Sequence, residues 1–513
     1  MPHELSALTM KSLSLSSGAE RLSLPRWLPL LLIVGIAIAI RSVVLTNLDE
    51  SWGLTMAEKV LDGQRLYVDI FEINPPATMF LYIVPALLGR LSGLPAEIFV
   101  DTLVFLASGL SLWLASRILQ RAGTADDDGW TLISVTTAAL LILPAHAFGE
   151  REHIALIAFI PILAVAAVRA QGKTPDWSMA IVAGIGGGIT AIIKPHFAVP
   201  IICAATVAAV QVRSWRPIFA LENWIAAFML AAYAILVVVA YPQFISDILP
   251  IVLAVYVPLR LPLPTLLVDV AVPLWVASVV LIALLKWRTL LAPAYSVLLA
   301  ASTGFLLAFL AQGKGWAYQS YPMLALILIA LAIAVIEQWR RKHDYAAAGR
   351  SARLTSGLAT SLIVGLTVSW MNVTVDPTAA AATVRTIKPH PKIMAFSSFL
   401  WTGFPLTRMV EGIWVGRFQF LWITGGVQYL RQHEPLDPAI ARRLDAYVAR
   451  EKAMVTEDIA RQRPDVILVD RLDRRIDWMA WANSYPPLAA EMRHYSPYRL
   501  VDGIEILRRG ADD

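Results

Sequence analysis

The chain has 513 residues, of which 57% are hydrophobic and 16% charged, and its formal net charge is +5. Because a soluble protein carries about 25% charged residues, this composition excludes a soluble fold for most of the chain and predicts a membrane protein. The basic residues form short clusters between apolar runs and no stripe interleaved with aromatic residues, so no nucleic-acid partner is expected. The single cysteine, Cys203, excludes intrachain disulfides and CxxC metal sites.

The N-terminal three quarters of the chain contain the candidate membrane spans. Residues 1–25 are polar and are predicted to form a cytoplasmic N-terminal tail. The apolar run that follows them lacks a small-residue cleavage site, so we expect an uncleaved first helix. Further apolar runs predict a membrane domain over residues 26–374. The runs cover residues 27–46, 77–89, 98–116, 131–148, 154–168, 178–193, 195–212, 220–240, 266–285, 290–311, 320–336 and 355–373.

The run at 77–89 decides how often the chain crosses the membrane. It is short and contains Pro85, which is typical of a re-entrant or juxtamembrane segment. If it does not cross, sixteen Lys and Arg residues of the short loops fall on one side and seven on the other. The seven are Lys59, Arg65, Arg90, Arg151, Lys194, Arg260 and Lys314. Because basic residues mark the cytoplasmic side, we expect about 11 transmembrane helices, a cytoplasmic N-terminus and a re-entrant or juxtamembrane outer loop over residues 47–96.

Residues 375–513 follow the last predicted span and have an ordinary, less apolar composition. Short strands are predicted at residues 392–397, 465–470 and 503–507, and a helix at 439–453. After an odd number of crossings this segment lies outside. The expected fold class is therefore mainly α, a polytopic bacterial inner-membrane protein with a small α/β periplasmic C-terminal domain.

Polar side chains gather in the predicted outer loops, at one lipid–water boundary. Such a concentration is costly at a membrane face and therefore points to function. The first outer loop contributes Asp49, Glu50, Asp69, Glu72 and Asn74, and Pro75 and Pro76 after them give a stiff entry to the next segment. Later outer loops contribute Glu150, Arg151, Glu152, Lys194, His196, Lys314 and Tyr318.

These residue types fit one kind of chemistry. A carboxylate beside the membrane can accept a proton from an attacking hydroxyl or amide group. Lysine and arginine at the same level can hold a lipid-borne phosphate and stabilise it as a leaving group. Glu150 and Glu152 can bind a divalent cation or orient the basic groups. The set fits group transfer from a lipid phosphate carrier, and taken alone it also fits a transporter.

Each candidate also has a structural interpretation. Asp49 can be the N-cap of a helix that runs to Leu61, because aspartate is a preferred cap. Glu150 can mark a helix start, where the helix dipole favours an acid. Lys194 precedes a proline between two apolar runs, where its side chain can extend to the interface. Lys314 lies between two glycines in a loop at a helix end.

One stretch of the first outer loop, LDESWGLTMAEKVLDGQRLYVDIFEINPPATMFLY, resembles a known family. An acidic pair after the first helix, a short helix ending in glycine and Tyr-x-Asp-x-Phe-x-x-Asn-Pro-Pro are similar to the GT-C glycosyltransferases that use polyprenyl-phosphate sugars. The similarity is to the branch of protein O-mannosyltransferases and lipid A aminoarabinose transferases. The acidic loop at Glu150–Glu152 and the segment Gln312–Tyr318 followed by Tyr321-Pro322 resemble further outer loops of that family. The resemblance covers residues 25–340.

The resemblance implies that Asp49 is the catalytic base, that Glu50 supports it and that the donor is a polyprenyl-phosphate-linked sugar. The acceptor is then a glycan, a lipid or a protein on the periplasmic side. Asn74 stands where many relatives have lysine, and Glu150 and Glu152 stand where many have aspartate. The C-terminal domain has no family resemblance, and we expect it to select or place the acceptor.

A transporter or flippase of a lipid-linked or anionic solute is the alternative function. It predicts charged residues in mid-span along several helices and a repeat that relates two halves of the chain. The sequence has Arg41 near the end of the first helix, few other charges in mid-span and no evident repeat. The transferase interpretation is therefore favoured.

Overall fold

The computed structural model describes residues 25–123, 129–340, 347–433 and 435–510. The predicted N-terminal tail, residues 1–25, lies outside the described residues apart from Pro25. Most of the described chain is helical, and the strands lie after residue 390.

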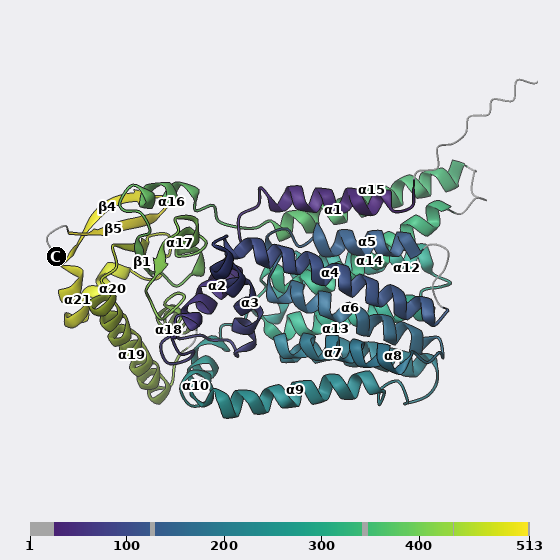
Figure 1. Cartoon of the computed structure of the whole chain (residues 1–513), viewed down its shortest axis with the longest axis horizontal. Coiled ribbons are helices and arrows are strands. Elements are labelled where there is room, and N and C mark those ends of the chain that lie inside the picture. Colours follow the sequence, from purple (N-terminus) through teal and green to yellow (C-terminus); the bar gives the residue numbers. More distant parts are fainter. Residues whose placement is uncertain (1–24, 124–128, 341–346, 434, 511–513) are drawn as a thin grey trace, which may run out of the picture.

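Long apolar helices form a bundle whose axis follows the long axis of the molecule (Figure 1). Its helices are α1 (Leu28–Arg41), α4 (Ala96–Arg121), α5 (Gly129–Leu141), α6 (Arg151–Ala170), α7 (Trp177–Ile193), α8 (Ala198–Gln211), α9 (Leu221–Ala240), α12 (Ala271–Lys286), α13 (Pro293–Gln312), α14 (Ala317–Arg340) and α15 (Ala347–Met371). Helices α6 and α14 are central, since most of their apolar windows are buried, whereas α9 is mostly exposed at the edge.

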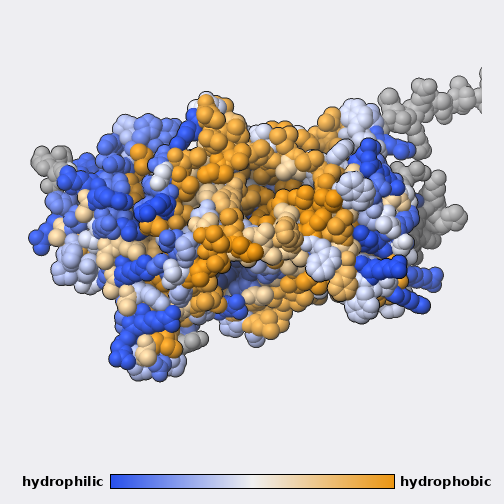
Figure 2. All heavy atoms as spheres, turned by 60° about the horizontal axis from the view of Figure 1, so that its bottom comes forward, coloured by the Kyte–Doolittle hydropathy of each residue, from blue (hydrophilic) through white to orange (hydrophobic). Residues whose placement is uncertain are grey.

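Six described helices are long and apolar enough to cross a membrane, and seven further apolar helices are shorter. Figure 2 shows a hydrophobic belt with hydrophilic surface at both ends of the molecule. A mainly α, polytopic membrane fold is therefore confirmed. The number of eleven crossings stays a prediction.

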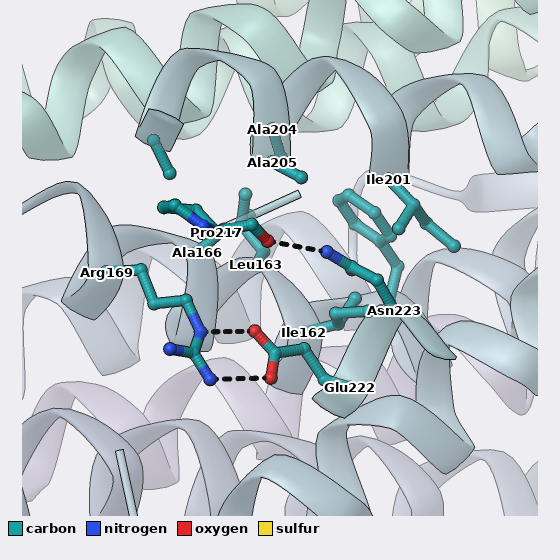
Figure 3. Close-up of a pocket in the computed structure, with 12 residues that line it drawn as sticks. Ile162, Leu163, Ala166, Arg169, Ile201, Ala204, Ala205, Pro217, Glu222 and Asn223 are labelled. Carbon is teal, nitrogen blue, oxygen red and sulfur yellow. Dashed lines mark hydrogen bonds and ion pairs between the residues drawn. The ribbon is translucent and has the colours of Figure 1, made fainter. Parts of the chain in front are cut away.

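An ion pair fastens the peripheral helix α9 to the centre of the bundle (Figure 3). Arg169 Nε and Nη2 of α6 donate to Glu222 Oε1 and Oε2 at 2.5 and 2.9 Å. The cavity beside this pair measures about 10 Å³, which is enough for about one water molecule at most. We conclude that the pair is structural.

Two shorter helices, α2 (Leu48–Leu61) and α3 (Ala77–Ser92), lie between the bundle and the C-terminal part of the chain (Figure 1). They pack against each other, and Gly53 of α2 lies directly against the ring of Tyr82 of α3. Gly63, with φ of +89°, follows the end of α2, where the sequence predicts the helix to stop.

The C-terminal part contains a five-stranded sheet in the order β2-β1-β3-β5-β4. Its strands are β1 (Lys392–Phe396), β2 (Ile413–Trp414), β3 (Val466–Asp470), β4 (Tyr495–Val501) and β5 (Ile504–Arg509). Strands β2, β1 and β3 are parallel, whereas β5 is antiparallel to β3 and β4. The three predicted strands are confirmed as β1, β3 and β5, and the predicted helix at 439–453 lies within α19 (Pro438–Gln462). Strands β2 and β4 were not predicted.

The C-terminal part contacts α2 through ion pairs, a hydrogen bond and apolar packing. Arg408 donates to both carboxylate oxygens of Glu58 at 2.8 and 3.0 Å, and to Glu97 Oε1 at 2.5 Å. Lys59 Nζ donates to the carbonyl of Gly416 at 2.8 Å. One hydrophobic cluster continues from Trp52 of α2 into the sheet. Residues of the C-terminal part therefore hold α2 in position.

Candidate active site

Helix α2 lies at the end of the bundle that borders the C-terminal part of the chain and carries Asp49 in its first turn. Its N-cap is Asn47, whose side chain accepts from the Asp49 N–H at 2.7 Å. The Asn47 amide also donates to the carbonyl of His146 at 2.7 Å, just before α6. The capping interpretation of Asp49 is therefore wrong, because Asn47 takes that role and leaves the Asp49 carboxylate free for other contacts.

Asp49 faces Arg151, the first residue of α6. Arg151 Nη2 lies 3.6 Å from Asp49 Oδ1, and a quarter of the Asp49 side chain remains exposed while Arg151 is buried. The N–H of Gly149, which has a φ of +79°, donates to His153 Nδ1 at 3.1 Å. This sharp turn into α6 presents Arg151 to the start of α2.

Lys194 joins the same group from the break between α7 and α8. Its Nζ donates to Glu152 Oε1, and to Gln312 Oε1 at 2.9 Å. The ammonium also lies 5.8 Å from the ring centre of Tyr318. Pro195 ends α7 at this point, since proline removes a backbone donor, and Lys194 is extended with φ of −145°. The structure thus brings together the predicted site residues Asp49, Arg151 and Glu152, Lys194, and Tyr318.

Three acids and two bases of this group share one buried volume. Burial raises the pKa of Asp49, and the positive charge of Arg151 opposes this rise. Burial raises the pKa of Glu150 well above its ordinary value, and the negative charges of Asp49 and Glu152 raise it further. Glu150 Oε2 has no hydrogen-bond partner among the described residues. With Glu150 protonated, the charges of Asp49, Glu152, Arg151 and Lys194 balance.

Glu50 lies on a different side of α2 from Asp49. It is fully buried against Gly149, where an added Cβ atom would lie 2.7 Å from Glu50 Oε2. Neither of its carboxylate oxygens has a hydrogen-bond partner in the described structure. Burial raises its pKa well above the ordinary value, while the nearby Arg41 opposes the rise. The structure therefore does not bring the Glu50 carboxylate into the group around Arg151.

The other predicted residues of the loop between α2 and α3 form hydrogen bonds that fix its conformation. Glu72 is buried and accepts from Trp52 Nε1 at 2.6 Å and from the Asn74 N–H at 2.8 Å. Tyr67 Oη donates to the Asn74 carbonyl at 2.7 Å, just before Pro75 and Pro76 lead into α3. Asp69 accepts from the backbone of Arg65 at 2.9 Å near the surface. These contacts hold the loop and leave Asp69 outside the buried group.

Lys314 and His196 lie beside this group with different contacts. Lys314 Nζ donates to the carbonyls of Tyr256 and Leu259 at 2.7 and 2.6 Å and lies 4.1 Å from the Tyr256 ring centre. Burial lowers the pKa of Lys314 to about 8. His196 has a buried Nε2 atom without a partner in the described part of the chain. Lys314 thus holds a loop in this structure.

Sequence reasoning missed the segment that Lys314 holds. It consists of two π-helical turns, η3 (Phe244–Ile248) and η4 (Val252–Tyr256), around the short helix α10 (Leu249–Ile251). The only signal was an aromatic and proline-rich stretch without clear period, which does not predict π-helical turns.

The described residues contain no group of three or more His, Cys, Asp or Glu side chains placed to hold a metal ion. Of the two predicted candidates, Glu152 is paired with Lys194. Binding of a divalent cation by Glu150 and Glu152 stays a prediction.

Comparison with known proteins shows a likeness to solved structures. No family model matches the sequence, and no curated protein matches it. A solved structure, "Crystal Structure of ArnT from Cupriavidus metallidurans bound to Undecaprenyl phosphate", matches 94% of this chain and 98% of its own, with a TM-score of 0.54 and 14% identity. The two chains therefore share a fold over nearly their whole length.

Proposed function

We propose that this protein is a membrane glycosyltransferase that moves a sugar from a polyprenyl-phosphate donor to an acceptor on the periplasmic face. The observation that supports it most is the group of Asp49, Arg151, Glu152 and Lys194 at one end of the bundle. The group lies in a fold shared with a protein that was crystallised with undecaprenyl phosphate. It combines a candidate proton acceptor with two cations, as transfer from a lipid phosphate requires.

In the proposed reaction Asp49 is the base. An acceptor hydroxyl or amine attacks the anomeric carbon of the donor sugar while the bond from that carbon to the phosphate oxygen breaks. The electron pair of this bond leaves with the lipid phosphate, and the proton of the nucleophile passes to Asp49. Attack opposite the leaving group inverts the anomeric centre. The raised pKa of Asp49 favours proton acceptance at neutral pH.

Lys194 and Arg151 would stabilise the leaving phosphate. Lys194 is paired with Glu152 and Gln312, and its Nζ is close to the ring of Tyr318. A donor phosphate adds negative charge to this group and would compete with Glu152 for the ammonium. Glu150, which lies next to Arg151 with one unpartnered oxygen, could donate its proton to the same phosphate.

The proposed location is a bacterial inner membrane with the N-terminus in the cytoplasm. Arg121 is the last residue of α4, and Lys173 and Arg213 follow the ends of α6 and α8, at the end of the bundle that is predicted to be cytoplasmic. This distribution follows the preference of basic loops for the cytoplasmic side. The C-terminal part, which borders α2, would then be periplasmic and would help to place a glycan, lipid or protein acceptor.

Gene deletion followed by mass spectrometry of the envelope glycans tests this function. The deletion strain is complemented with the wild type, with Asp49→Asn and with Asp69→Asn, and membrane levels are measured for each. We expect one sugar to disappear and to return with the wild type and with Asp69→Asn, a surface carboxylate of the same loop, but not with Asp49→Asn. If Asp49→Asn restores the sugar fully, Asp49 is not the catalytic base, and a transporter or flippase is favoured.

A further inference from the structure

The carboxyl ends of β1 and β3 form an edge of the C-terminal sheet that the proposed transfer step does not use. β1 leads into Ser397, and the chain continues to β2 on one side of β1. β3 leads into Arg471, and the chain continues to β4 and β5 on the other side. Connections that leave two neighbouring parallel strands in opposite directions mark the position where open sheets bind ligands.

Polar side chains occupy this edge in a fixed arrangement. Ser397 Oγ donates to Asp470 Oδ2 at 2.8 Å, and Ser398 Oγ donates to Asp473 Oδ2 at 2.6 Å. Arg475 donates to Asp473 through Nε at 2.7 Å and through Nη2 at 2.8 Å. About a third of the Arg475 side chain is exposed, and its Nη1 donates no hydrogen bond to any residue of the described structure. The guanidinium is therefore held in place with one donor left for a ligand.

The ring of Phe399 lies beside the guanidinium, and the ring of Trp401 stacks on that of Phe399. The rings of Phe399 and Trp401 stack with centroids 6.1 Å apart and planes 24° apart. The Arg475 guanidinium lies 5.2 Å from the Phe399 ring centre, and the Phe399 side chain is 40% exposed. A sugar ring has an apolar face of C–H bonds that packs on aromatic rings, and hydroxyl groups at its rim that accept from a fixed donor such as Arg475. Few precisely placed polar groups beside apolar surface are typical of small-ligand sites.

This edge is connected to the buried group at the outer end of the bundle through α18 (Trp422–His433). The N–H of Leu421 donates to the Ser397 carbonyl at 2.8 Å, and α18 packs against η4. The Trp422 ring lies 6.5 Å from the ring of Tyr256, whose carbonyl accepts from Lys314. The buried Trp422 Nε1 has no acceptor among the described residues. This donor can form a hydrogen bond with a water molecule or with a polar ligand atom.

We propose that Phe399, Trp401 and Arg475 form a subsite for a sugar ring of the acceptor, so that the acceptor is a glycan or a glycolipid. This inference rests on the proposed glycosyl transfer and names the class of its acceptor. The C-terminal part would bind one sugar of the acceptor at the sheet edge and direct the next group toward Asp49.

Binding measurements on the purified full-length protein test this subsite. The probes are an array of soluble pyranose oligosaccharides and a glucosamine-based glycolipid in phosphatidylcholine nanodiscs, so that the two arms separate a free glycan from a glycolipid. We expect the wild type to bind a probe, and Phe399→Ala and Trp401→Ala to weaken that binding at least tenfold. Trp401→Tyr should retain it, because an aromatic face remains.

Two further variants separate this result from folding and from the transfer step. Tyr498→Ala, which removes an exposed ring from β4 of the same sheet, should bind as the wild type does. Asp49→Asn should also bind normally, so that a loss of transfer with intact binding concerns the proposed function alone. Absence of binding to every probe, or equal binding by Trp401→Ala and the wild type, would overturn the subsite.

Discussion

At the scale of single residues, the proposed chemistry depends on one retained proton. Among the described residues, Arg151 and Lys194 are the cations that act on Asp49, Glu150 and Glu152. Because an uncompensated buried charge is costly, the group is most stable with one acid neutral. Glu150 is that acid, since burial and two neighbouring carboxylates raise its pKa. Asp49 then stays ionised opposite Arg151 and is available as a base.

The pH dependence of the reaction follows from Asp49. Burial raises its pKa above the ordinary value of 3.8, so acidification protonates this base at a higher pH than it protonates a free aspartate. We expect the rate constant to fall as the pH decreases through the raised pKa and to level off above it. Asp49→Asn should lower the rate constant about 10² to 10⁴-fold and remove this acid limb. A pH–rate profile of the purified protein measures both, and an unchanged acid limb in the variant would contradict the assignment.

Replacing Lys194 and replacing Lys314 should have different effects on the protein. Lys194→Ala deletes a cation next to Asp49 and Arg151, and we expect the rate constant to fall about 10²-fold or more. Lys314→Ala deletes two hydrogen bonds to backbone carbonyls and should mainly increase amide hydrogen exchange at residues 252–259. Single-turnover kinetics and exchange mass spectrometry measure these outcomes. Equal loss of rate in both variants would contradict the difference in their roles.

The sequence predicted which loops carry the site residues, but not the direction in which each side chain points. Arg151 and Lys194 were predicted to lie at one boundary with Asp49, and they do. Consecutive residues of a helix point about 100° apart, so Asp49 and Glu50 face different surroundings although they are adjacent in the sequence. The rotation of α2 depends on packing against α3 and the C-terminal part, which local sequence does not encode.

At the scale of elements, the ion pairs of Arg408 with Glu58 and Glu97 hold helix α2, which carries the candidate base Asp49. We call this contact the clamp on α2. We expect Arg408→Ala to destabilise the protein by about 3 kcal/mol, because it leaves Glu58 and Glu97 without their cation in a partly buried site. Arg431→Ala, which removes an exposed pair with Asp445, should change stability by less than about 1 kcal/mol. Thermal unfolding of both variants in detergent measures the difference. Equal unfolding temperatures would show that the clamp adds no stability.

The elements that were predicted have a strong local pattern, and those that were missed depend on distant partners. Strands β1 and β3 are mainly apolar runs, β5 begins with alternating apolar and charged residues after a glycine, and α19 has an amphipathic period. Strand β2 has two residues and exists through its pairing with β1. Strand β4 contains Pro497 and pairs with β5 across an irregular register, so its sequence gives a weak strand signal.

At the scale of the whole molecule, the orientation in the membrane is a direct prediction of the loop charges. In a Cys203→Ala background, Arg499→Cys on β4 should react with a membrane-impermeant maleimide added to intact spheroplasts. Lys173→Cys, in the loop between α6 and α7, should react only after permeabilisation. Both positions are exposed, so accessibility of the side chain does not limit the reaction. The reverse pattern would place Asp49 on the cytoplasmic side and contradict the proposed periplasmic reaction.

The contact between Arg408 and Glu58 of α2 also bears on when the proposed site is completed during synthesis. Glu58 leaves the ribosome early, whereas Arg408 follows 350 residues later. Because the chain is made and inserted from its N-terminus, Asp49 reaches the membrane long before the segment that holds its helix in place. We therefore expect the proposed transfer to begin only after the C-terminal part has been made and has docked on α2.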